Sequence, residues 1–513
     1  MGVGQLPRAA AVPLVVAAAA TAARLPFVGR PLSSDEGGFL LVAGQWSPGR
    51  SLYGNYWVDR PPLLIAFFGL ADRLGGAVAL RLLGAALAAA AVLLAARVGR
   101  LVADRVGAGD PHPAVVVAAL TSGVFLASPL VGSFEVDGEL VAVPLVLLGL
   151  VLLLEGDRAA LGRRLPVRRL LLLVAAGVVG AAAALVKQNE LDVLLAAGPL
   201  LVLARGPAGH RAGVRRVVAD LAGVAIGAVA LTALVVLAAD VRGTEPGALW
   251  DAVVTFRLQA GEVIRASASA ATGERFRRVL VAGITSGAVL LPVVMVFGAR
   301  RWRRGPAAPV LWTALVVVGW EVFTVAAGGS YWLHYLVALV PGLVLCGSLA
   351  AASPGRLRIA AGAALGYAAL VATVALAVLL VHPVGQSKDG GVDTWLVAHA
   401  RPGDTAVVAY GHPDILESTG MSSPYPGLWS LPVRVRDPRL TDLATVLAGS
   451  DRPTWVVTMR GPGTTSLGGW GIDPARAQSQ LDAHYRSVAE VDGHLVYLER
   501  GIPLATSAAR APA

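Results

Sequence analysis

The stretch LAGVAIGAVALTALVVLAA, residues 221–239, decides the class of protein because it contains no charged side chain. At about 1.5 Å of rise per residue, a helix of this length crosses the roughly 30 Å hydrocarbon core of a bilayer. The whole chain has the same bias, since 56% of its 513 residues are hydrophobic, only 15% are charged, and the mean hydropathy is +0.67. Soluble domains carry about 25% charged residues. The sequence therefore predicts an all-α polytopic membrane protein.

Similar apolar runs recur along most of the chain and predict about eleven transmembrane helices. The first run, preceded by Arg8, also fits a secretory signal peptide, and the residues alone leave that alternative open. The predicted spans lie near 9–28, 77–96, 113–131, 138–154, 170–186, 191–204, 217–239, 279–298, 307–327, 336–352 and 359–381.

The excess of positive charge follows this pattern of spans. The net charge is +10, but the arginines cluster at the ends of apolar runs, and basic residues do not alternate with aromatic ones as in nucleic-acid-binding proteins. Segment 61–76, PPLLIAFFGLADRLGG, decides the sidedness because it is apolar but short. If it lies flat at the interface, the arginine-rich connections all fall on one side: 97–112, 155–169, 205–216, 299–305 and 353–358.

The connections on the opposite side are poorer in positive charge. Segments 129–137 and 328–335 contain no Lys or Arg, as expected for an extracytoplasmic face, whereas 240–278 carries arginines and counts against the assignment. We expect a multi-pass protein of a bacterial cell (inner) membrane with a cytoplasmic N-terminus. The segments expected outside are 24–76, 129–137, 187–190, 240–278, 328–335 and 382–513.

The last part of the chain, 385–513, has ordinary composition and is expected to form a small extracytoplasmic α/β domain behind a membrane domain, 1–384. Asp492-Gly493 is a hairpin signal between two of its strands. The single cysteine, Cys346, excludes an intrachain disulfide. The expected strands are 405–410, 454–458, 487–491 and 494–498, and the expected helices are 439–448 and 474–485.

Two acidic motifs stand in the first outside segment. Asp35-Glu36 follows the first span, and a carboxylate pair at a membrane face can deprotonate a hydroxyl or bind a metal. The alternative is that Ser34 or Asp35 caps a short helix. Asp59-Arg60 precedes two prolines, and a guanidinium there can hold phosphate through two hydrogen bonds. The alternative is an arginine that meets lipid head groups.

A second group of charged residues lies in later outside segments. Glu135, Asp137 and Glu139 stand close together without a cation nearby in sequence, so they are either solvated, which we favour, or paired with a distant residue. Lys187 is costly at membrane depth and suggests an anionic partner. The alternative is a solvated turn in which Lys187 pairs with Glu190.

Aromatic residues open the span near 336–352. Tyr331, Trp332 and Tyr335 are ordinary interface anchors, but His334 could bind phosphate or polarise a leaving group. No histidine pair has the spacing of helical metal ligands, and no Gly-rich loop follows a strand, so a nucleotide-sugar site is not expected.

Taken together, these motifs resemble the GT-C superfamily of integral-membrane glycosyltransferases, in the branch of protein O-mannosyltransferases (glycosyltransferase family 39) and the lipid A aminoarabinose transferase. The family pattern is an acidic pair, an interfacial helix with Trp and Gly, a Tyr, and a basic residue before proline. Weaker matches are Val136 to Leu140, Leu185-Val186-Lys187, and His334-Tyr335 with Pro341, and the resemblance covers residues 1–381. The first-loop pattern stands here as Asp35-Glu36, Trp46, Gly49, Tyr53 and Asp59-Arg60-Pro61-Pro62.

The resemblance implies a polytopic enzyme that moves a sugar from a polyprenyl phosphate to an extracytoplasmic lipid, glycan or protein. Asp35 would be the catalytic base, with Glu36 beside it, and Asp137 a second active-site acid. Donor phosphate would be held by Arg60, Lys187, His334 and Tyr335, and the further site candidates are Asp59, Glu135, Glu139 and Tyr53.

This chain departs from the family pattern in two places: Arg60 stands where relatives often have Lys, and Gln188 where a Gly is common. Both departures affect the expected geometry of the donor site. Some relatives use a divalent metal, which Asp35 with Asp137 could bind, but no cofactor is expected.

Two other functions place acids and a lysine at membrane depth. A transporter or lipid flippase would do so, but it should also show inverted repeats with broken helices at the midplane. A non-catalytic envelope assembly protein would use the tail for binding, and the retained Asp35, Arg60 and Asp137 argue against it.

Overall fold

The computed structural model describes residues 8–161, 166–204, 213–266, 270–382, 390–459, 467–469 and 471–505. Backbone contacts divide the chain into two compact units. We call them the helical unit (Met1–Val28, Leu80–Val235 and Ser269–His382) and the mixed unit (Gly29–Ala79, Val236–Ala268 and Pro383–Ala513). The expected boundary at 384, and parts of the arginine-rich connections 155–169 and 205–216, lie outside the described residues.

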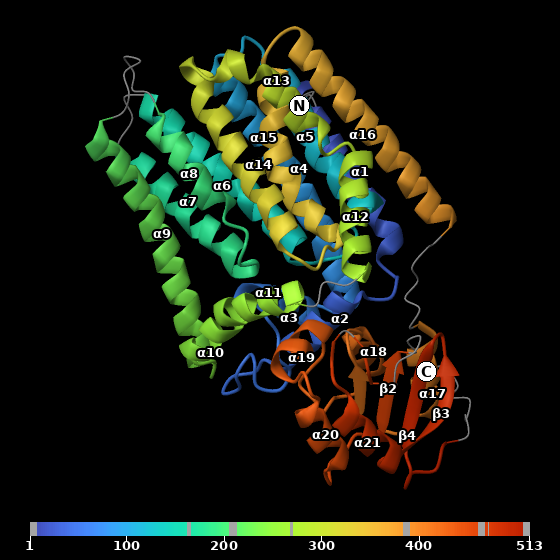
Figure 1. The fold of residues 1–513 in the computed structure, drawn as a ribbon. Coiled ribbons are helices and arrows are strands. Elements are labelled where there is room, and N and C mark those ends of the chain that lie inside the picture. Colours follow the sequence, from blue (N-terminus) through green and yellow to red (C-terminus); the bar gives the residue numbers. More distant parts are fainter. Residues whose placement is uncertain are drawn as a thin grey trace, which may run out of the picture. The chain divides into compact units, whose positions relative to one another are not determined.

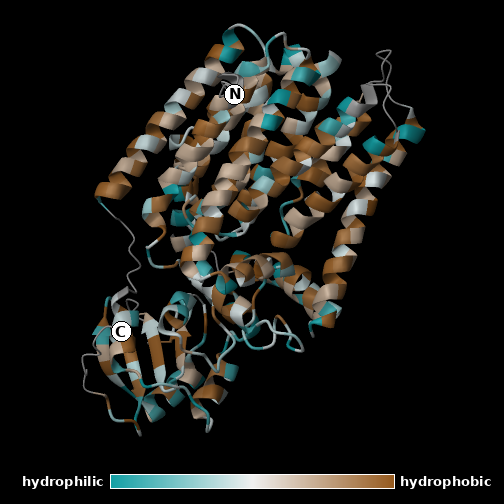
Figure 2. Cartoon of the chain, turned by 180° about the vertical axis from the view of Figure 1, so that it is seen from behind, coloured by the Kyte–Doolittle hydropathy of each residue, from teal (hydrophilic) through white to brown (hydrophobic). Residues whose placement is uncertain are grey.

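The helical unit is built from long apolar helices (Figures 1 and 2). The described residues contain seven helices that are long and apolar enough to span a membrane, or eight if the bent pair α12 and α13, with 62° between its halves, counts as one span. Its elements are α1 (Arg8–Arg24), α4 (Ala77–Val106), α5 (His112–Leu126), α6 (Gly138–Leu161), α7 (Pro166–Val186), α8 (Asp192–Val202), α9 (Val214–Val241), α12 (Ala270–Thr285), α13 (Leu290–Trp302), α14 (Ala308–Ala327), η5 (Leu333–Leu339), α15 (Val340–Ala352) and α16 (Arg356–Val381).

The expected count of eleven spans is not confirmed. The expected spans near 9–28, 113–131 and 191–204 correspond to shorter apolar helices, Ala11–Phe27, His112–Leu126 and Asp192–Val202. The last has 11 residues and contains Pro199, so it rises only about 17 Å, about half of a bilayer core. Window hydropathy registers apolar character but not where a helix stops.

Close contacts between small residues hold neighbouring helices of this unit together. A Cβ added at Gly177 on α7 would lie 1.9 Å from the Val224 carbonyl oxygen, and one at Gly227 on α9 would lie 2.0 Å from that of Val174. Such a crossing accepts only glycine, as is common where helices pack within a bilayer. The same two helices are joined by Arg169, whose Nε donates to Asp220 Oδ1 at 2.8 Å.

The mixed unit combines short helices with one four-stranded sheet. The strand order is β1-β2-β4-β3, with β1 parallel to β2 and the other pairs antiparallel. Its elements are α2 (Ser34–Gln45), α3 (Pro62–Arg73), α10 (Pro246–Trp250), η3 (Asp251–Thr255), α11 (Phe256–Ala266), α17 (Gly390–His399), β1 (Ala406–Ala409), α18 (Pro413–Thr419), α19 (Ser430–Arg436), α20 (Thr441–Ala448), β2 (Trp455–Met459), α21 (Ala475–His484), β3 (Tyr485–Val491) and β4 (His494–Glu499).

The sheet confirms the α/β tail that the sequence predicts, including its four strands and the helices α20 and α21. Asp492 and Gly493 form the turn between β3 and β4 with φ values of 47° and 79°, the left-handed pair that a tight hairpin requires. Helices α17, α18 and α19 are not among the predicted elements. Two of them have only 7 residues, too few for a periodic apolar pattern to show.

The segment 61–76, which decides the expected sidedness, contains a single helix. Helix α3 has 12 residues and therefore rises only about 18 Å. That is too short to cross the hydrocarbon core as a helix, and agrees with the expectation that this segment does not span.

Candidate functional site

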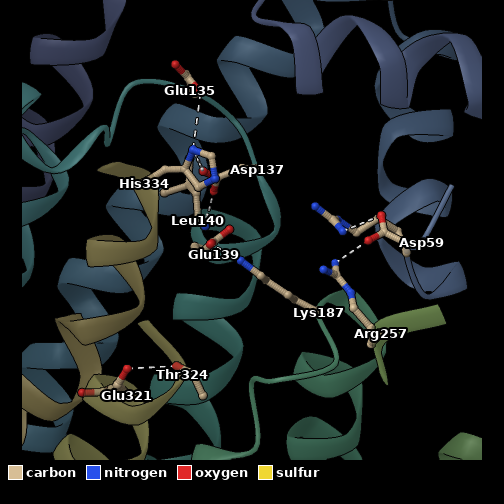
Figure 3. Close-up of polar contacts among 11 residues, drawn as sticks. Asp59, Glu135, Asp137, Glu139, Leu140, Lys187, Arg257, Glu321, Thr324 and His334 are labelled. Atoms are coloured by element: carbon tan, nitrogen blue, oxygen red, sulfur yellow. Dashed lines mark hydrogen bonds and ion pairs between the residues drawn. The ribbon is translucent and has the colours of Figure 1, made fainter. Parts of the chain in front are cut away.

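Asp137 stands at the start of α6 in the helical unit. Its Oδ1 accepts a hydrogen bond from the Leu140 backbone N–H at 2.9 Å, which is N-capping geometry and fixes the carboxylate. Its Oδ2 is buried without a hydrogen-bond partner among the described residues and lies 3.6 Å from His334 Nδ1 (Figure 3). Burial and the neighbouring Glu139 raise the pKa of Asp137 to about 7, although His334 pulls in the other direction.

The loop before α6 holds His334 in place. His334 lies in the short helix η5, and Glu135 Oε2 lies 3.7 Å from its Nδ1. Gly132, with φ 66°, packs against the η5 backbone so closely that a Cβ there would lie 2.7 Å from the backbone nitrogen of His334. A side chain at position 132 would therefore push the histidine away from the two acids.

Lys187 follows the end of α7 and forms a buried ion pair with Glu139. Its Nζ also lies 4.7 Å from the centre of the Tyr335 ring, a cation–π distance. The favoured expectation that the acids of this loop are solvated is wrong for Asp137 and Glu139, because both are buried beside groups that are distant in sequence. The alternative of a solvated turn at Lys187 and Glu190 is also wrong, because both residues are buried and Lys187 forms an ion pair with Glu139.

Among the described residues, Asp137, Glu139 and His334 form the one group whose donor atoms could hold a metal ion, with ligand atoms within 4.8 Å of one another. Carboxylates and an imidazole suit a divalent transition metal. Asp137 Oδ2 offers a free acceptor, but Glu139 is already neutralised by Lys187. Asp35 is in the mixed unit and is not a member of this group.

Three further buried acids lie in the helical unit beyond this cluster. Glu321 Oε1 accepts from the Gly342 N–H at 2.8 Å, and Glu190, Asp192 and Glu321 each carry one buried oxygen without a hydrogen-bond partner among the described residues. Burial, with Asp192 nearby, raises the pKa of Glu190 well above its usual range. Neither Asp192 nor Glu321 belongs to a motif in the sequence: Asp192 opens an apolar run two residues after Glu190, and Glu321 stands alone within another.

In the mixed unit, Glu36 takes part in capping helix α2. Ser33 is the N-cap of α2: its Oγ accepts from the Glu36 N–H, and Glu36 Oε2 accepts from the Ser33 N–H at 2.9 Å. This reciprocal pair is a capping box. The expected cap, Ser34 or Asp35, is therefore wrong by one or two residues, and Glu36 is fully buried in the cap.

Asp35 lies next to this cap, and its carboxylate makes a different contact. Its Oδ1 accepts a hydrogen bond from Trp429 Nε1 at 3.0 Å, and the side chain is half-buried. Trp429 immediately precedes α19 in the tail, almost four hundred residues away in sequence. A sequence motif in the first loop gives no signal for such a partner.

Asp59 and Arg60 form the second acidic motif. Arg60 binds Asp59 Oδ1 at 2.7 Å. Arg257 binds Asp59 Oδ2 at 2.6 Å (Figure 3). Burial raises the pKa of Asp59, but Arg257 and Arg60 overcome it and hold the pKa below its usual value. Tyr53 donates to the Arg60 carbonyl oxygen at 3.1 Å, which fixes the backbone of this turn, and burial, with Asp59 adding to it, raises the pKa of the phenol.

The structure thus gathers the predicted residues into two sets, each within one unit. Asp137, Glu139, Lys187, His334 and Tyr335 lie together in the helical unit, with Glu135 at the side. In the mixed unit, Tyr53, Asp59 and Arg60 lie together, while Asp35 and Glu36 are at the start of α2. Arg257 and Trp429 are contributed by segments without a sequence motif and are not among the predicted site residues.

Comparison with solved structures identifies the fold. ArnT from Cupriavidus metallidurans in the apo state matches with a TM-score of 0.58 at 14% identity, covering 96% of this chain and 98% of that one. The same protein bound to undecaprenyl phosphate matches at 0.55 and 14%, covering 95% and 97%. The archaeal oligosaccharyltransferase AglB from Archaeoglobus fulgidus, in complex with an inhibitory peptide and a dolichol-phosphate, matches at 0.54 and 13%, covering 94% and 79%.

No family model and no curated protein sequence matches the chain. At these identities the likeness concerns the fold alone. It extends over nearly the whole chain, tail included, and it agrees with the fold that the sequence resemblance implies. The protein therefore has the fold of the solved ArnT and AglB structures.

Proposed function

We propose that the protein transfers a sugar from a polyprenyl-phosphate-linked donor to an extracytoplasmic acceptor by an inverting single displacement. The observation that carries this proposal is the Lys187 site: a buried ammonium beside Glu139, Asp137, His334 and Tyr335 at one end of membrane helices of GT-C fold. Lys187 is paired with Glu139 in this structure, and the phosphate of a lipid donor would be a second anion for the same ammonium.

The donor class follows from this chemistry and from the fold. A polyprenyl phosphate is a lipid anion that reaches a site at the membrane face from the bilayer. Relatives of this fold are solved with undecaprenyl phosphate and with a dolichol-phosphate. Lys187 and Arg60 would neutralise the phosphate as negative charge develops on it during departure.

The reaction needs one base and no covalent intermediate. Asp35 would take the proton of the acceptor hydroxyl as its oxygen forms a bond to the anomeric carbon. On the opposite face of the sugar the bond from that carbon to the phosphate oxygen breaks, and the electron pair leaves with polyprenyl phosphate. A divalent cation held by Asp137, Glu139 and His334 would add Lewis-acid stabilisation of that phosphate.

The proposed orientation places the N-terminus in the cytoplasm and the tail outside. Trp302 is buried and donates to Ser353 Oγ at 2.9 Å, so the exposed Arg301 is the better labelling site in the cytoplasmic connection. In a Cys346→Ser background, Arg301→Cys and the tail variant Ser450→Cys should label from opposite sides with an impermeant thiol reagent. Labelling of both from the same side would overturn the orientation.

Transfer by the purified protein tests the function. The protein is reconstituted in liposomes with radiolabelled polyprenyl-phosphate mannose, arabinose and other pentoses, together with an extract of envelope lipids, glycans and proteins. We expect one donor to lose its label to an acceptor, with polyprenyl phosphate released in equal amount. Movement of intact donor between leaflets without transfer would instead identify a flippase, and neither event with any donor would favour an assembly protein.

A further inference from the structure

The first turn of α2, which carries Asp35, has a glycine face. A Cβ at Gly37 would lie 2.5 Å from Asp414 Cα, and one at Gly38 would lie 2.3 Å from the Trp429 ring. Both neighbours belong to the tail. Only glycine lets the tail approach this turn, so the sequence Asp35-Glu36-Gly37-Gly38 is shaped to receive it.

Other bonds fix the tail on the first loop independently of Trp429. Ser34 Oγ donates to the Gly411 carbonyl at 2.6 Å, and the Ser423 N–H donates to Tyr56 Oη at 2.7 Å. The Trp57 N–H donates to the Pro426 carbonyl at 3.1 Å. These contacts bring the loop that carries Trp429 to the same place whether or not the indole makes its own hydrogen bond.

The indole is suited to orient a base. Its Nε1–H only donates, and at 3.0 Å from Asp35 Oδ1 it occupies one carboxylate oxygen. The other oxygen is left to accept a proton. Because the donor is neutral, the bond fixes the carboxylate without supplying the cation that would neutralise it, in contrast to the arginines around Asp59.

We infer that Trp429 is a positioning residue for Asp35, so that the tail completes the catalytic centre; this inference rests on the proposed function. A base is effective only when its accepting oxygen lies within hydrogen-bond reach of the proton it removes. Without Trp429 the Asp35 side chain is free to rotate away from the acceptor. The tail would then act on the rate of the chemical step and leave donor binding unchanged.

Replacement of the indole tests this. Trp429→Phe keeps a ring against Phe39, whose ring centre lies 5.5 Å away, but removes the N–H. We expect kcat to fall at least about tenfold, as for loss of a hydrogen bond to a charged group, with the donor KM unchanged. Gly38→Ala keeps the N–H but displaces the indole, and should lower kcat in the same way.

A matched control exists within the tail. Trp455 Nε1 donates to Asp404 Oδ2 at 2.9 Å, another indole–carboxylate bond that does not involve α2. Trp455→Phe should leave kcat within about twofold of wild type. Protection of the tail from protease reports docking in every variant. Equal loss of kcat in Trp429→Phe and Trp455→Phe, or wild-type kcat in Trp429→Phe or Gly38→Ala, would overturn the inference.

The outcome for Asp35 separates the two proposals. If Asp35→Asn is inactive while Trp429→Phe is as fast as wild type, the positioning role fails and the proposed function stands. If Asp35→Asn transfers sugar normally, the proposed base is wrong, and the positioning role fails with it.

Discussion

The two acidic motifs of the first loop look alike in sequence but differ in their partners. Asp59 is held by two arginines, Arg60 at 2.7 Å and Arg257 at 2.6 Å, whereas Asp35 accepts one hydrogen bond from a neutral indole at 3.0 Å. A carboxylate between two cations has its charge neutralised and serves to orient them. A carboxylate held by a neutral donor remains available to take a proton. We therefore propose a structural role for Asp59 and a catalytic role for Asp35.

The largest expected effect comes from Asp35 itself. Asp35→Asn preserves the volume and the Oδ1 acceptor for Trp429, but removes the proton acceptor. Loss of a general base typically costs about 10²–10⁴-fold in rate, so turnover in the liposome assay should fall at least about a hundredfold with normal expression and donor binding.

Glu36→Gln is the control, because glutamine at this position also completes a capping box. Its loss of turnover should be smaller than that of Asp35→Asn. If Asp35→Asn keeps near-normal transfer while Glu36→Gln abolishes it, the base is Glu36. If both variants stay active, the mechanism is wrong.

The Lys187–Glu139 pair extends the comparison to the helical unit. Lys187→Met removes the ion-pair partner of the buried Glu139, which typically costs on the order of 3–5 kcal/mol of unfolding free energy. The double variant Lys187→Met with Glu139→Gln should recover most of the thermal stability in detergent but not the transfer. Recovery of both would assign Lys187 to folding alone.

Arg60 and Arg257 separate phosphate binding from the support of Asp59. Arg60→Ala should weaken donor use by about 10- to 100-fold, as expected from the roughly 1.5–3 kcal/mol of hydrogen bonds to a charged group, while thermal stability changes little. Arg257→Ala is the matched variant, because it removes the other guanidinium from the same carboxylate. Equal donor affinities for the two variants would show that Arg60 only supports the loop.

The smallest effect concerns the pH dependence of the mixed unit. Burial, with Asp72 nearby, raises the pKa of Glu417 on α18 to about 7 from an ordinary value of 4.5. The folded state holds this proton more tightly than the unfolded state does, so stability should fall as pH rises from 4.5 to 7. Glu417→Gln should flatten this slope and raise the melting temperature at pH 8; an unchanged slope would assign the pH dependence to other groups.

The sequence was sufficient to predict elements with a strong periodic pattern and to group residues that stand in one local motif. The membrane class, the four tail strands and the Asp492-Gly493 turn all follow from local patterns. The order of Asp35, Tyr53 and Arg60 in one loop also pointed to the GT-C fold. Span lengths did not follow, because hydropathy windows do not register where helices such as α8 end.

Partners contributed by distant segments were beyond sequence reasoning. Lys187 contacts Glu139 and Tyr335 only because three separate helical elements pack together. Arg257 and Trp429 reach the first loop from segments without a motif, and only the fold brings them there. The solvated state expected for Asp137 and Glu139 failed for the same reason: their neighbours are close in space and far in sequence.

The stereochemistry of transfer tests the central claim most directly. A donor with a single anomeric configuration at its phosphate linkage is converted by the purified protein, and the product linkage is determined by NMR. A single displacement by an acceptor that Asp35 deprotonates must invert the anomeric configuration, so the account predicts a product of the opposite configuration. Retention of the donor configuration would require a covalent or otherwise two-step route and would contradict the account.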